Sequence, residues 1–222
     1  MKTSRQFYTE LKVDGLAPRK NKTRTKKELS YLVKLFDKKD KILDLACGYG
    51  RFTIPLAKKR YDIEGIDITP LFIKRARKDA KKEKLNIKFR LGDMRKLPYK
   101  DNSFNKIICM WSAFIELYTK KDQIKAIKEM KRVLISRGLV FIDMPIPKKS
   151  YLTYKNEKDG DEYIVKGNFT LGRIGNIEKM PQYIHNKSTL TALMKEGNIK
   201  KFKISKSEFG GKKRLLLKFW KE

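Results

Sequence analysis

The chain has 222 residues, with 55 Lys and Arg against 25 Asp and Glu, so its formal net charge is +30 at pH 7. Its length is enough for one domain with a substantial core, and no apolar stretch approaches the ~20 residues that span a membrane. One histidine and two cysteines are too few for a Cys/His zinc site, and the N-terminus lacks the apolar core of a secretory signal. We therefore expect a cytoplasmic protein without a metal or a membrane partner.

The first part of the chain, residues 1–40, is polar and basic, and only 26–36 has the apolar face of a helix. From 41 to 144, short apolar runs alternate with helical patterns, which is typical of parallel βαβ units with right-handed crossovers. We expect strands at 41–46, 62–67, 87–91, 104–110 and 138–144, and helices at 51–60, 70–84 and 121–134.

After residue 144 the alternation stops, because Pro145 and Pro147 end the fifth expected strand. Short aromatic and β-branched runs then predict a β-rich insertion over 145–187. The last part of the chain, 188–222, contains an expected helix at 188–196 and expected strands at 199–205 and 214–220. No linker or internal repeat divides the sequence, so residues 1–222 are expected to form a single domain.

The most informative stretch is the turn after the first expected strand, Asp44-Leu-Ala-Cys-Gly-Tyr-Gly50. Gly48 and Gly50 allow a ligand to approach the backbone, and the start of the following helix offers N–H groups without helical partners. The second expected strand also ends in an acidic residue, Asp67, and another, Asp93, follows the third expected strand. The spacing predicts a site for a nucleotide-like ligand at the carboxyl ends of the strands.

Together these residues resemble the motifs of the class I S-adenosylmethionine (SAM)-dependent methyltransferases, from about Lys41 to Asp143. The "CGYGR" and "GDMR" elements are most similar to small members of that family. The resemblance implies an α/β fold with a Rossmann-like, doubly wound, seven-stranded and mostly parallel sheet that ends in an antiparallel C-terminal hairpin. A dinucleotide is the alternative ligand, but Thr53 occupies the third position of G-x-G-x-x-G, and Asp44 would repel a pyrophosphate.

The resemblance also implies a role for individual residues toward SAM. Asp44 is expected near the amino group of SAM, Asp67 on the ribose hydroxyls, and Asp93 on the adenine amino group; each has an alternative as a turn cap, a strand end or a helix cap. In many class I enzymes the segment before the first strand folds over SAM, so Arg24 is expected to meet its carboxylate, unless the N-terminus is only a solvated tail. The complete expected cofactor set is Asp44, Ala46, Gly48, Tyr49, Gly50, Asp67, Ile68, Asp93, Met94, Met110 and Arg24.

The acceptor is expected between the segment after the fourth strand and the insertion at 145–187. Trp111 and Phe114 are candidates for an apolar wall or a cation–π contact, with core packing as the alternative. Tyr8 is expected to close the substrate side, and His185 to contact the substrate, unless it is an ordinary loop histidine. No catalytic residue is assigned, although His185, Asp143, Glu116 and Tyr118 lie where a general base would be needed.

The sequence thus favours a SAM-dependent methyltransferase that acts on a small molecule. The alternative is an RNA methyltransferase acting on tRNA or rRNA, because a charge of +30 favours polyanions. A surface of solvated lysines explains the same charge without any ligand, and no RNA-binding module is recognisable. A SAM-binding protein without turnover is a remote third alternative.

Overall fold

A computed structural model describes residues 3–16, 22–146 and 181–222, together with short strands at 152–155, 162–165, 169–170 and 176–177. Side chains are described for 3–13, 22–146 and 182–222. Most of the expected insertion, including the side chains of its aromatic runs, therefore lies outside the described residues. Within the described parts of the chain, no helix is both long and apolar enough to cross a membrane.

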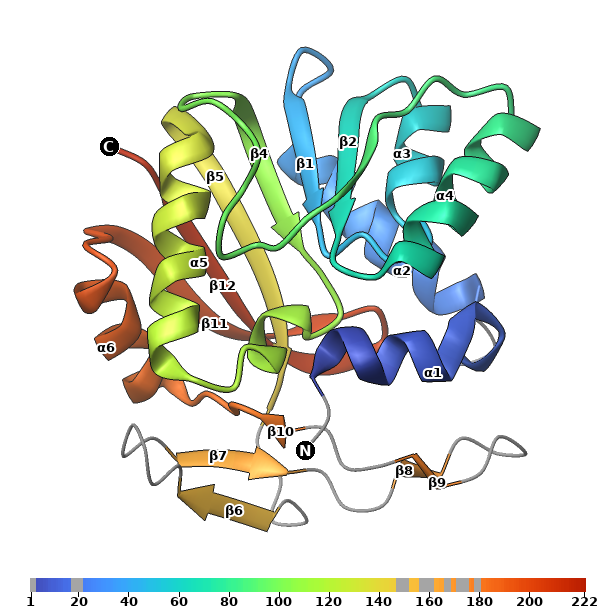
Figure 1. The fold of residues 1–222 in the computed structure, drawn as a ribbon. Helices are drawn as coiled ribbons and strands as arrows, with labels where there is room; N and C mark the ends of the chain where they lie inside the picture. The colour runs from blue at the N-terminus through green and yellow to red at the C-terminus, as the bar shows by residue number, and fades with distance from the viewer. Residues whose placement is uncertain are drawn as a thin grey trace.

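A seven-stranded sheet in the order β11-β12-β5-β4-β1-β2-β3 forms the centre of the molecule (Figure 1). Neighbouring strands from β5 to β3 pair in parallel, whereas β12 pairs antiparallel with both β5 and β11. This order confirms the expected doubly wound sheet with an antiparallel C-terminal hairpin. The strands are β1 (Lys41–Leu45), β2 (Asp62–Asp67), β3 (Phe89–Leu91), β4 (Phe104–Cys109), β5 (Leu134–Pro145), β11 (Lys201–Phe209) and β12 (Lys212–Trp220).

Helices cover both faces of this sheet because the central strands are buried on both sides. One core cluster joins α5 and α6 to β4, β5 and β12, and a second joins α2 and α3 to β1 and the end of β11. A third, smaller cluster joins α4 to β3. The helices are α2 (Lys22–Leu32, continued by the 3-10 turn η2, Val33–Leu35), α3 (Thr53–Lys58), α4 (Pro70–Lys82), α5 (Lys120–Val133) and α6 (Lys187–Glu196), and a 3-10 turn, η3 (Ala113–Glu116), follows β4.

An additional helix, α1 (Ser4–Leu16), lies across the carboxyl ends of the central strands (Figure 1). No helix was predicted for this segment. Phe7 and Leu11, four residues apart, are 4% and 2% exposed, and they anchor the helix against the rest of the molecule. The helix is kinked at Lys12, where φ is 56° and ψ is 174°. The N-terminal segment is therefore positioned to cover whatever binds at this edge of the sheet.

The region after β5 contains the β-structure that its sequence predicts. One small sheet has the order β10-β7-β6, and β8 pairs with β9 (Figure 1). These strands are β6 (Leu152–Lys155), β7 (Glu162–Val165), β8 (Phe169–Thr170), β9 (Asn176–Ile177) and β10 (Pro181–Gln182).

Candidate functional site

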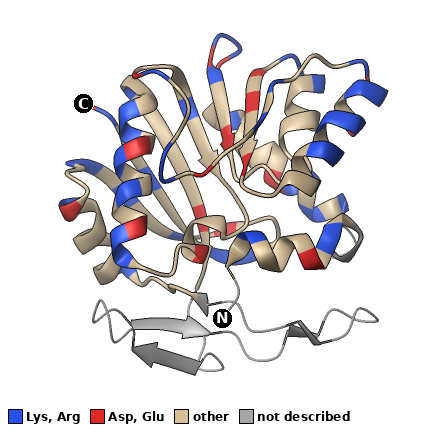
Figure 2. Ribbon diagram, viewed as in Figure 1, with Lys and Arg blue, Asp and Glu red and all other residues tan. Residues whose placement is uncertain are grey.

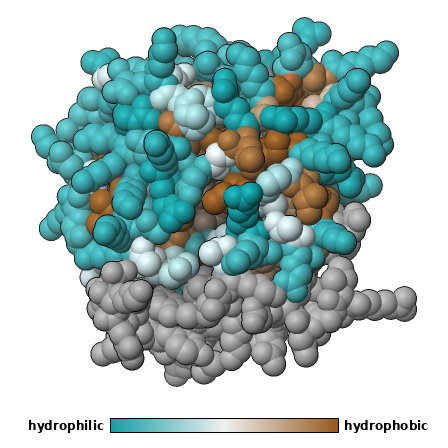
Figure 3. Space-filling view, viewed as in Figure 1, coloured by the Kyte–Doolittle hydropathy of each residue, from teal (hydrophilic) through white to brown (hydrophobic). Residues whose placement is uncertain are grey.

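A cavity of about 300 Å³ opens at the carboxyl ends of β1, β2 and β4. In the orientation of Figure 1, the space-filling view shows hydrophobic side chains near the centre of the molecule, framed by hydrophilic ones (Figure 3). The glycine turn, the ends of β2 and β3, the segment after β4, η3 and α1 all contribute to its lining. The expected cofactor residues that line it are Ala46, Gly48, Asp67, Ile68, Asp93, Met94 and Met110, whereas Asp44, Tyr49, Gly50 and Arg24 do not.

The two glycines of the turn have different tasks. Gly48 has φ of +57°, and a Cβ atom there would meet only Phe72, at 3.9 Å. A Cβ on Gly50, with φ of +83°, would instead approach Ile54 at 3.0 Å and Phe89 at 3.2 Å. Gly48 therefore leaves space that a ligand can occupy, while Gly50 allows helix α3 and strand β3 to pack closely behind the turn.

The carboxylate of Asp67 is fixed at the end of β2 by two backbone groups. Its Oδ2 accepts a hydrogen bond from the N–H of Gly48 at 2.8 Å, and its Oδ1 accepts one from the N–H of Thr69 at 2.8 Å. These bonds tie β2 to the glycine turn, so the cavity and the turn share one carboxylate. A carboxylate has further lone pairs, which suits the two adjacent hydroxyls of a ribose.

Asp44 lies behind the turn rather than in the cavity wall. It is 1% exposed, and its Oδ2 accepts a hydrogen bond from Thr53 Oγ1 at 2.6 Å. Thr53 stands where a dinucleotide-binding turn would have its third glycine, at the start of α3. The pair therefore joins the end of β1 to the first turn of that helix.

The far end of the cavity is bounded by an arginine between two carboxylates. Arg95 donates to Asp93 at 2.6 Å and to Asp122 at 2.7 Å. Burial by itself raises the pKa of Asp93, but the hydrogen bonds from Arg95 outweigh it and hold that pKa below its usual value. Asp93 is therefore ionised at neutral pH and keeps its ability to accept a hydrogen bond.

Tyr8 and Glu116 meet at the side of the cavity nearest α1. The hydroxyl of Tyr8 donates to Glu116 Oε1 at 2.5 Å, and both residues line the cavity. The Tyr8 ring also lies 5.5 Å from the ring of Phe72. Burial, and then the charge of Glu116, raise the pKa of Tyr8 well above its ordinary value, so Tyr8 stays protonated.

Trp111 is part of the cavity wall, and a buried polar cluster around Glu28 holds it in place. Its indole N–H donates to Glu28 Oε1 at 3.0 Å, and Glu28 also accepts from Arg24 at 2.9 Å and from Arg51 at 2.5 Å. The guanidinium carbons of Arg51 and Arg24 lie 4.2 and 4.6 Å from the centre of the indole ring. Arg51 lines the cavity, whereas Arg24 holds the wall together from behind.

Asp143 supports the same wall from beneath. It is fully buried, it accepts from the backbone N–H of Trp111 at 2.5 Å, and it is paired with Arg214. Trp111 and Ser112 both have positive φ, of 60° and 69°, so the turn is strained. Asp143 accepts hydrogen bonds from the backbone N–H groups of both residues, and Arg214 donates one to the Ser112 hydroxyl. Asp143 is therefore placed to shape the cavity wall.

Phe114 and His185 are placed in the core rather than at the cavity. Phe114 is fully buried, and its ring stacks on His185 at 6.2 Å. The imidazole of His185 lies 2.8 Å from Gln123 Oε1 and 3.2 Å from Thr189 Oγ1, and burial lowers its pKa from 6.5 to about 3. At neutral pH this ring is uncharged and enclosed, which suits a structural role.

His185 should make the chain less stable in mild acid. Because its pKa is lower in the folded chain than in the unfolded chain, only the unfolded chain gains its proton as the pH falls from about 6.5 towards 3. Above pH 6.5 the ionisation of His185 does not change the free energy of unfolding. Between pH 6.5 and about 3, this free energy decreases by about 1.4 kcal/mol for each pH unit that the pH falls. Urea unfolding at several pH values, with His185→Gln for comparison, measures this slope. An equal slope in both proteins would contradict the assignment.

Several lining residues were not expected from the sequence. Phe72 lies near the start of α4, Ser4 and Arg5 belong to α1, and Thr3 directly precedes that helix. Phe72 follows Asp67 closely, at the beginning of a helix that faces the turn, and this position was a usable signal. The contribution of α1 had only a weak signal, the apolar pair Phe7 and Leu11 in a charged segment.

Comparison with known sequences gives a consistent assignment for the central part of the chain. Residues 42–138 match a family model described as a methyltransferase domain. An uncharacterized methyltransferase of Schizosaccharomyces pombe is 34% identical over 149 residues, which cover 63% of this chain and 52% of that protein. A demethylmenaquinone methyltransferase of Deinococcus radiodurans is 34% identical over 110 residues, which cover 48% and 44%. The chain thus spans about half the length of the curated relatives it matches.

Solved structures share the fold over almost the whole chain. A SAM-dependent methyltransferase from Clostridium acetobutylicum has a TM-score of 0.69 at 16% identity, covering 94% of this chain and 95% of that one. The PH0226 protein of Pyrococcus horikoshii has a TM-score of 0.66 at 24% identity, with 88% of each chain covered. At these identities the likeness concerns the fold alone.

Proposed function

We propose that this chain, whose residues 42–138 match a methyltransferase domain, is a class I SAM-dependent methyltransferase that transfers a methyl group to a small-molecule acceptor. The observation that carries the proposal is the helix that covers part of the site. Helix α1 covers the carboxyl ends of the strands, and the Tyr8–Glu116 hydrogen bond joins this cover to η3. A cavity of about 300 Å³ is at the lower end of the range for small-ligand sites.

SAM is the cofactor of this family, and the residues at the cavity fit it. The open space in front of Gly48 accepts a ligand close to the backbone, and the Asp67 carboxylate is fixed where it meets a ribose. Ile68 and Met94 would contact the adenine ring, and Asp93 its amino group. When bound, SAM supplies a methyl group activated by a positively charged sulfur.

The chain itself contributes mainly position and exclusion of water. An activated methyl group needs little more than alignment with a nucleophile, so a rigid wall on the acceptor side matters most. Trp111 is held on that side by Glu28 through its indole and by Asp143 through its backbone. Residues of α1 cover the opening and limit the water that reaches the reacting groups.

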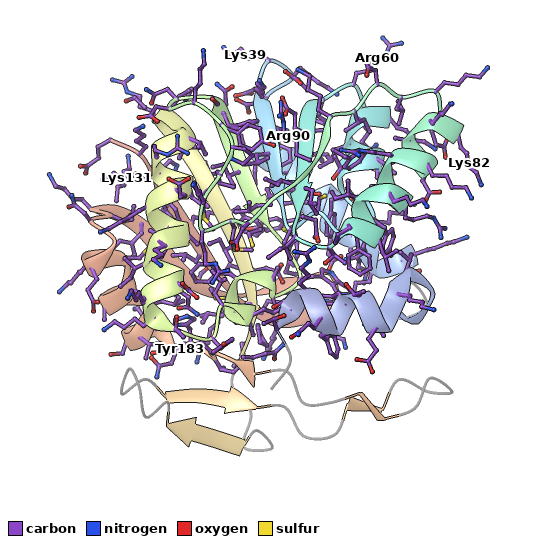
Figure 4. The ribbon with its side chains drawn as sticks, in the orientation of Figure 1. Lys39, Arg60, Lys82, Arg90, Lys131 and Tyr183 are labelled. Carbon is purple, nitrogen blue, oxygen red and sulfur yellow. The ribbon has the colours of Figure 1, made fainter. Side chains whose placement is uncertain are left out.

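An RNA acceptor is the second candidate, because the chain carries a net charge of +30. Lys and Arg are, however, spread over α1, α4, α5 and the loops at the opposite end of the sheet (Figure 2). Lys39, Arg60 and Lys82 point outward at the edge away from α1 (Figure 4). This distribution suits a general solvated surface better than a path that leads a strand to the cavity.

Calorimetry with S-adenosylhomocysteine (SAH), the demethylated product, tests the cofactor half of the proposal. The wild-type chain should bind SAH, and Asp67→Ala should bind it roughly 10- to 100-fold more weakly, because charge-assisted hydrogen bonds to the ribose are lost. Glu83→Ala, which removes an exposed carboxylate paired with Lys58 outside the cavity, is the control and should bind SAH normally. Equal affinity in Asp67→Ala and wild type would contradict the placement of the cofactor.

The acceptor is tested by incubation with methyl-labelled SAM and either a small-metabolite extract or total RNA. Label is expected in the metabolite fraction. Transfer into RNA alone would replace the small-molecule proposal with the RNA alternative, whereas binding of RNA that weakens with salt would report only charge. SAH binding without transfer to either fraction would favour a SAM-binding protein without turnover.

A further inference from the structure

The proposed placement of SAM assigns no role to one of the carboxylates that line the cavity. Among the described residues, Asp67, Asp93, Glu116 and Asp122 line the cavity. Asp67 and Asp93 are assigned to the cofactor, and Asp122 is paired with Arg95 at the same end as Asp93. Glu116 comes from η3, after β4, and its partner Tyr8 comes from α1. Glu116 therefore lies at the side of the cavity nearest α1, away from the residues assigned to the adenine.

We propose that Glu116 binds the acceptor and removes its proton, so that the acceptor is an amine or a hydroxyl compound. This inference rests on the proposed methyltransferase function. A carboxylate accepts hydrogen bonds and donates none when ionised, so it selects an N–H or O–H group. It also repels an acceptor whose nucleophile is itself a carboxylate.

The Tyr8 hydroxyl demonstrates the geometry that such an acceptor would use. It donates to Glu116 Oε1 at 2.5 Å from within the cavity lining, so the carboxylate is already directed at a hydrogen-bond donor. An acceptor N–H or O–H can replace this donor or share the carboxylate with it. Because burial and the Glu116 charge keep Tyr8 protonated, the pair is a neutral donor on a charged acceptor, which is a strong type of hydrogen bond.

The neighbours of Glu116 favour this role over a purely structural one. Leu117, Ala113, Trp111 and Tyr118, which are close to Glu116 in the sequence, also line the cavity, and an apolar wall strengthens a hydrogen bond to a charged group. The Trp111 ring already lies against two guanidinium groups, at 4.2 and 4.6 Å. A cationic amine would be repelled there, so Glu116 is the better site for a positively charged nitrogen.

The reaction step balances without a further reagent. A positively charged amine gives up a proton before it reacts, because an ammonium nitrogen has no lone pair. The lone pair of the neutral nitrogen or of the oxygen then forms a bond to the methyl carbon, the bond from that carbon to sulfur breaks, and its electron pair returns to sulfur. The proton of the acceptor moves to a Glu116 oxygen and later to solvent. Tyr8 acts as a positioning residue, because it orients the carboxylate through its hydroxyl and does not take the proton.

Chemical capping of the metabolite extract tests the class of acceptor. One part is treated with acetic anhydride, which caps amines and hydroxyls, one with an acetyl succinimidyl ester, which caps amines, and one is esterified at its carboxylates. Wild-type chain and methyl-labelled SAM should then give label in the esterified part and lose it in the anhydride-treated part. The succinimidyl arm separates amines from hydroxyls. Label that persists after anhydride treatment and is lost after esterification would overturn the proposal.

Glu116→Gln tests the residue with the same untreated extract. Transfer should fall roughly 100-fold or more, in the range of a lost general base, while the SAH dissociation constant from calorimetry stays within about twofold of wild type. Glu116→Asp should recover part of the activity. The acid limb of the pH–rate profile should disappear in Glu116→Gln. The charge of Glu116 acts on Tyr8 from α1 and on Cys109 from β4, and Asp67 from β2 acts on the same Tyr8.

The matched control is Glu83→Gln, which makes the same chemical change at an exposed ion pair with Lys58 outside the cavity, and it should keep wild-type transfer. If Glu116→Gln transfers label at the wild-type rate, the inference fails and the proposed function stands. If the wild-type chain binds SAH and labels no metabolite, the proposed function fails together with it. If Glu116→Gln does not fold, Glu116→Asp and the capping arms decide the question.

Discussion

Replacing Glu28 with alanine is expected to cost about 3–5 kcal/mol of the free energy of unfolding, as measured by urea denaturation. Glu28 is fully buried and accepts hydrogen bonds from Arg24, Arg51 and the Trp111 indole. Without it, the guanidinium of Arg51, which is 7% exposed, keeps its charge in the interior without its carboxylate. Such an uncompensated charge costs more than the lost pair contributes, and the wall around Trp111 loses its anchor.

Two further variants distinguish the effect of an unpaired buried charge on stability from the effect of removing a carboxylate. Glu83→Ala removes an exposed carboxylate paired with Lys58 and should change the free energy of unfolding by less than about 1 kcal/mol. The double variant Glu28→Met with Arg51→Met removes both charges and should recover much of the stability that Glu28→Ala loses. A loss of less than about 1 kcal/mol in Glu28→Ala would mean that the cluster is solvated in solution.

The sheet was predictable because its signals are local. β2 spans Asp62–Asp67, the range that its apolar run predicts, and the alternation of strands and helices gave the parallel order. β5 is longer than expected, because it begins at Leu134 rather than at Gly138. A register shift between Phe104 and Lys106 of β4 lets the two strands pair across this region, and no pattern in the sequence of β5 marks such an irregularity.

Helix α1 was missed because most of its stability comes from packing. The segment has few apolar residues and the helix is kinked at Lys12, so apolar residues do not recur clearly every 3.6 positions. Phe7 and Leu11 are nevertheless almost fully buried, where the helix contacts α4. Tertiary contacts of this kind override a weak local preference.

The candidate site was predictable where a motif fixes the backbone and not where partners decide the direction of a side chain. Gly48 and Asp67 line the cavity because a turn and a strand end place them there. Arg24 was expected at the cofactor, but its position is set by Glu28, one helical turn away. Phe114 and His185 stack on each other in the core, a contact between residues 71 positions apart that the sequence does not reveal.

Gly48→Val is expected to abolish measurable SAH binding in calorimetry, which corresponds to a loss of roughly 100-fold or more. A Cβ at this position would meet only Phe72, at 3.9 Å, so the branched side chain extends into the space assigned to the cofactor. The chain should still fold. The φ of +57° is unfavourable for valine, and we expect a loss of about 1–2 kcal/mol in the free energy of unfolding from this strain.

The control must reproduce the strain without the obstruction, and Gly211→Val does so. Gly211 has φ of +78° in the turn between β11 and β12, where a Cβ would meet only the flexible side chain of Lys27, at 3.7 Å. It should lose a similar amount of stability and keep wild-type affinity for SAH, because it does not line the cavity. Gly48→Ala has the same backbone strain with less volume, so its affinity should lie between those of wild type and Gly48→Val. Wild-type SAH binding by Gly48→Val would show that the cofactor does not approach this turn, and the placement of SAM over β1 and β2 would be wrong.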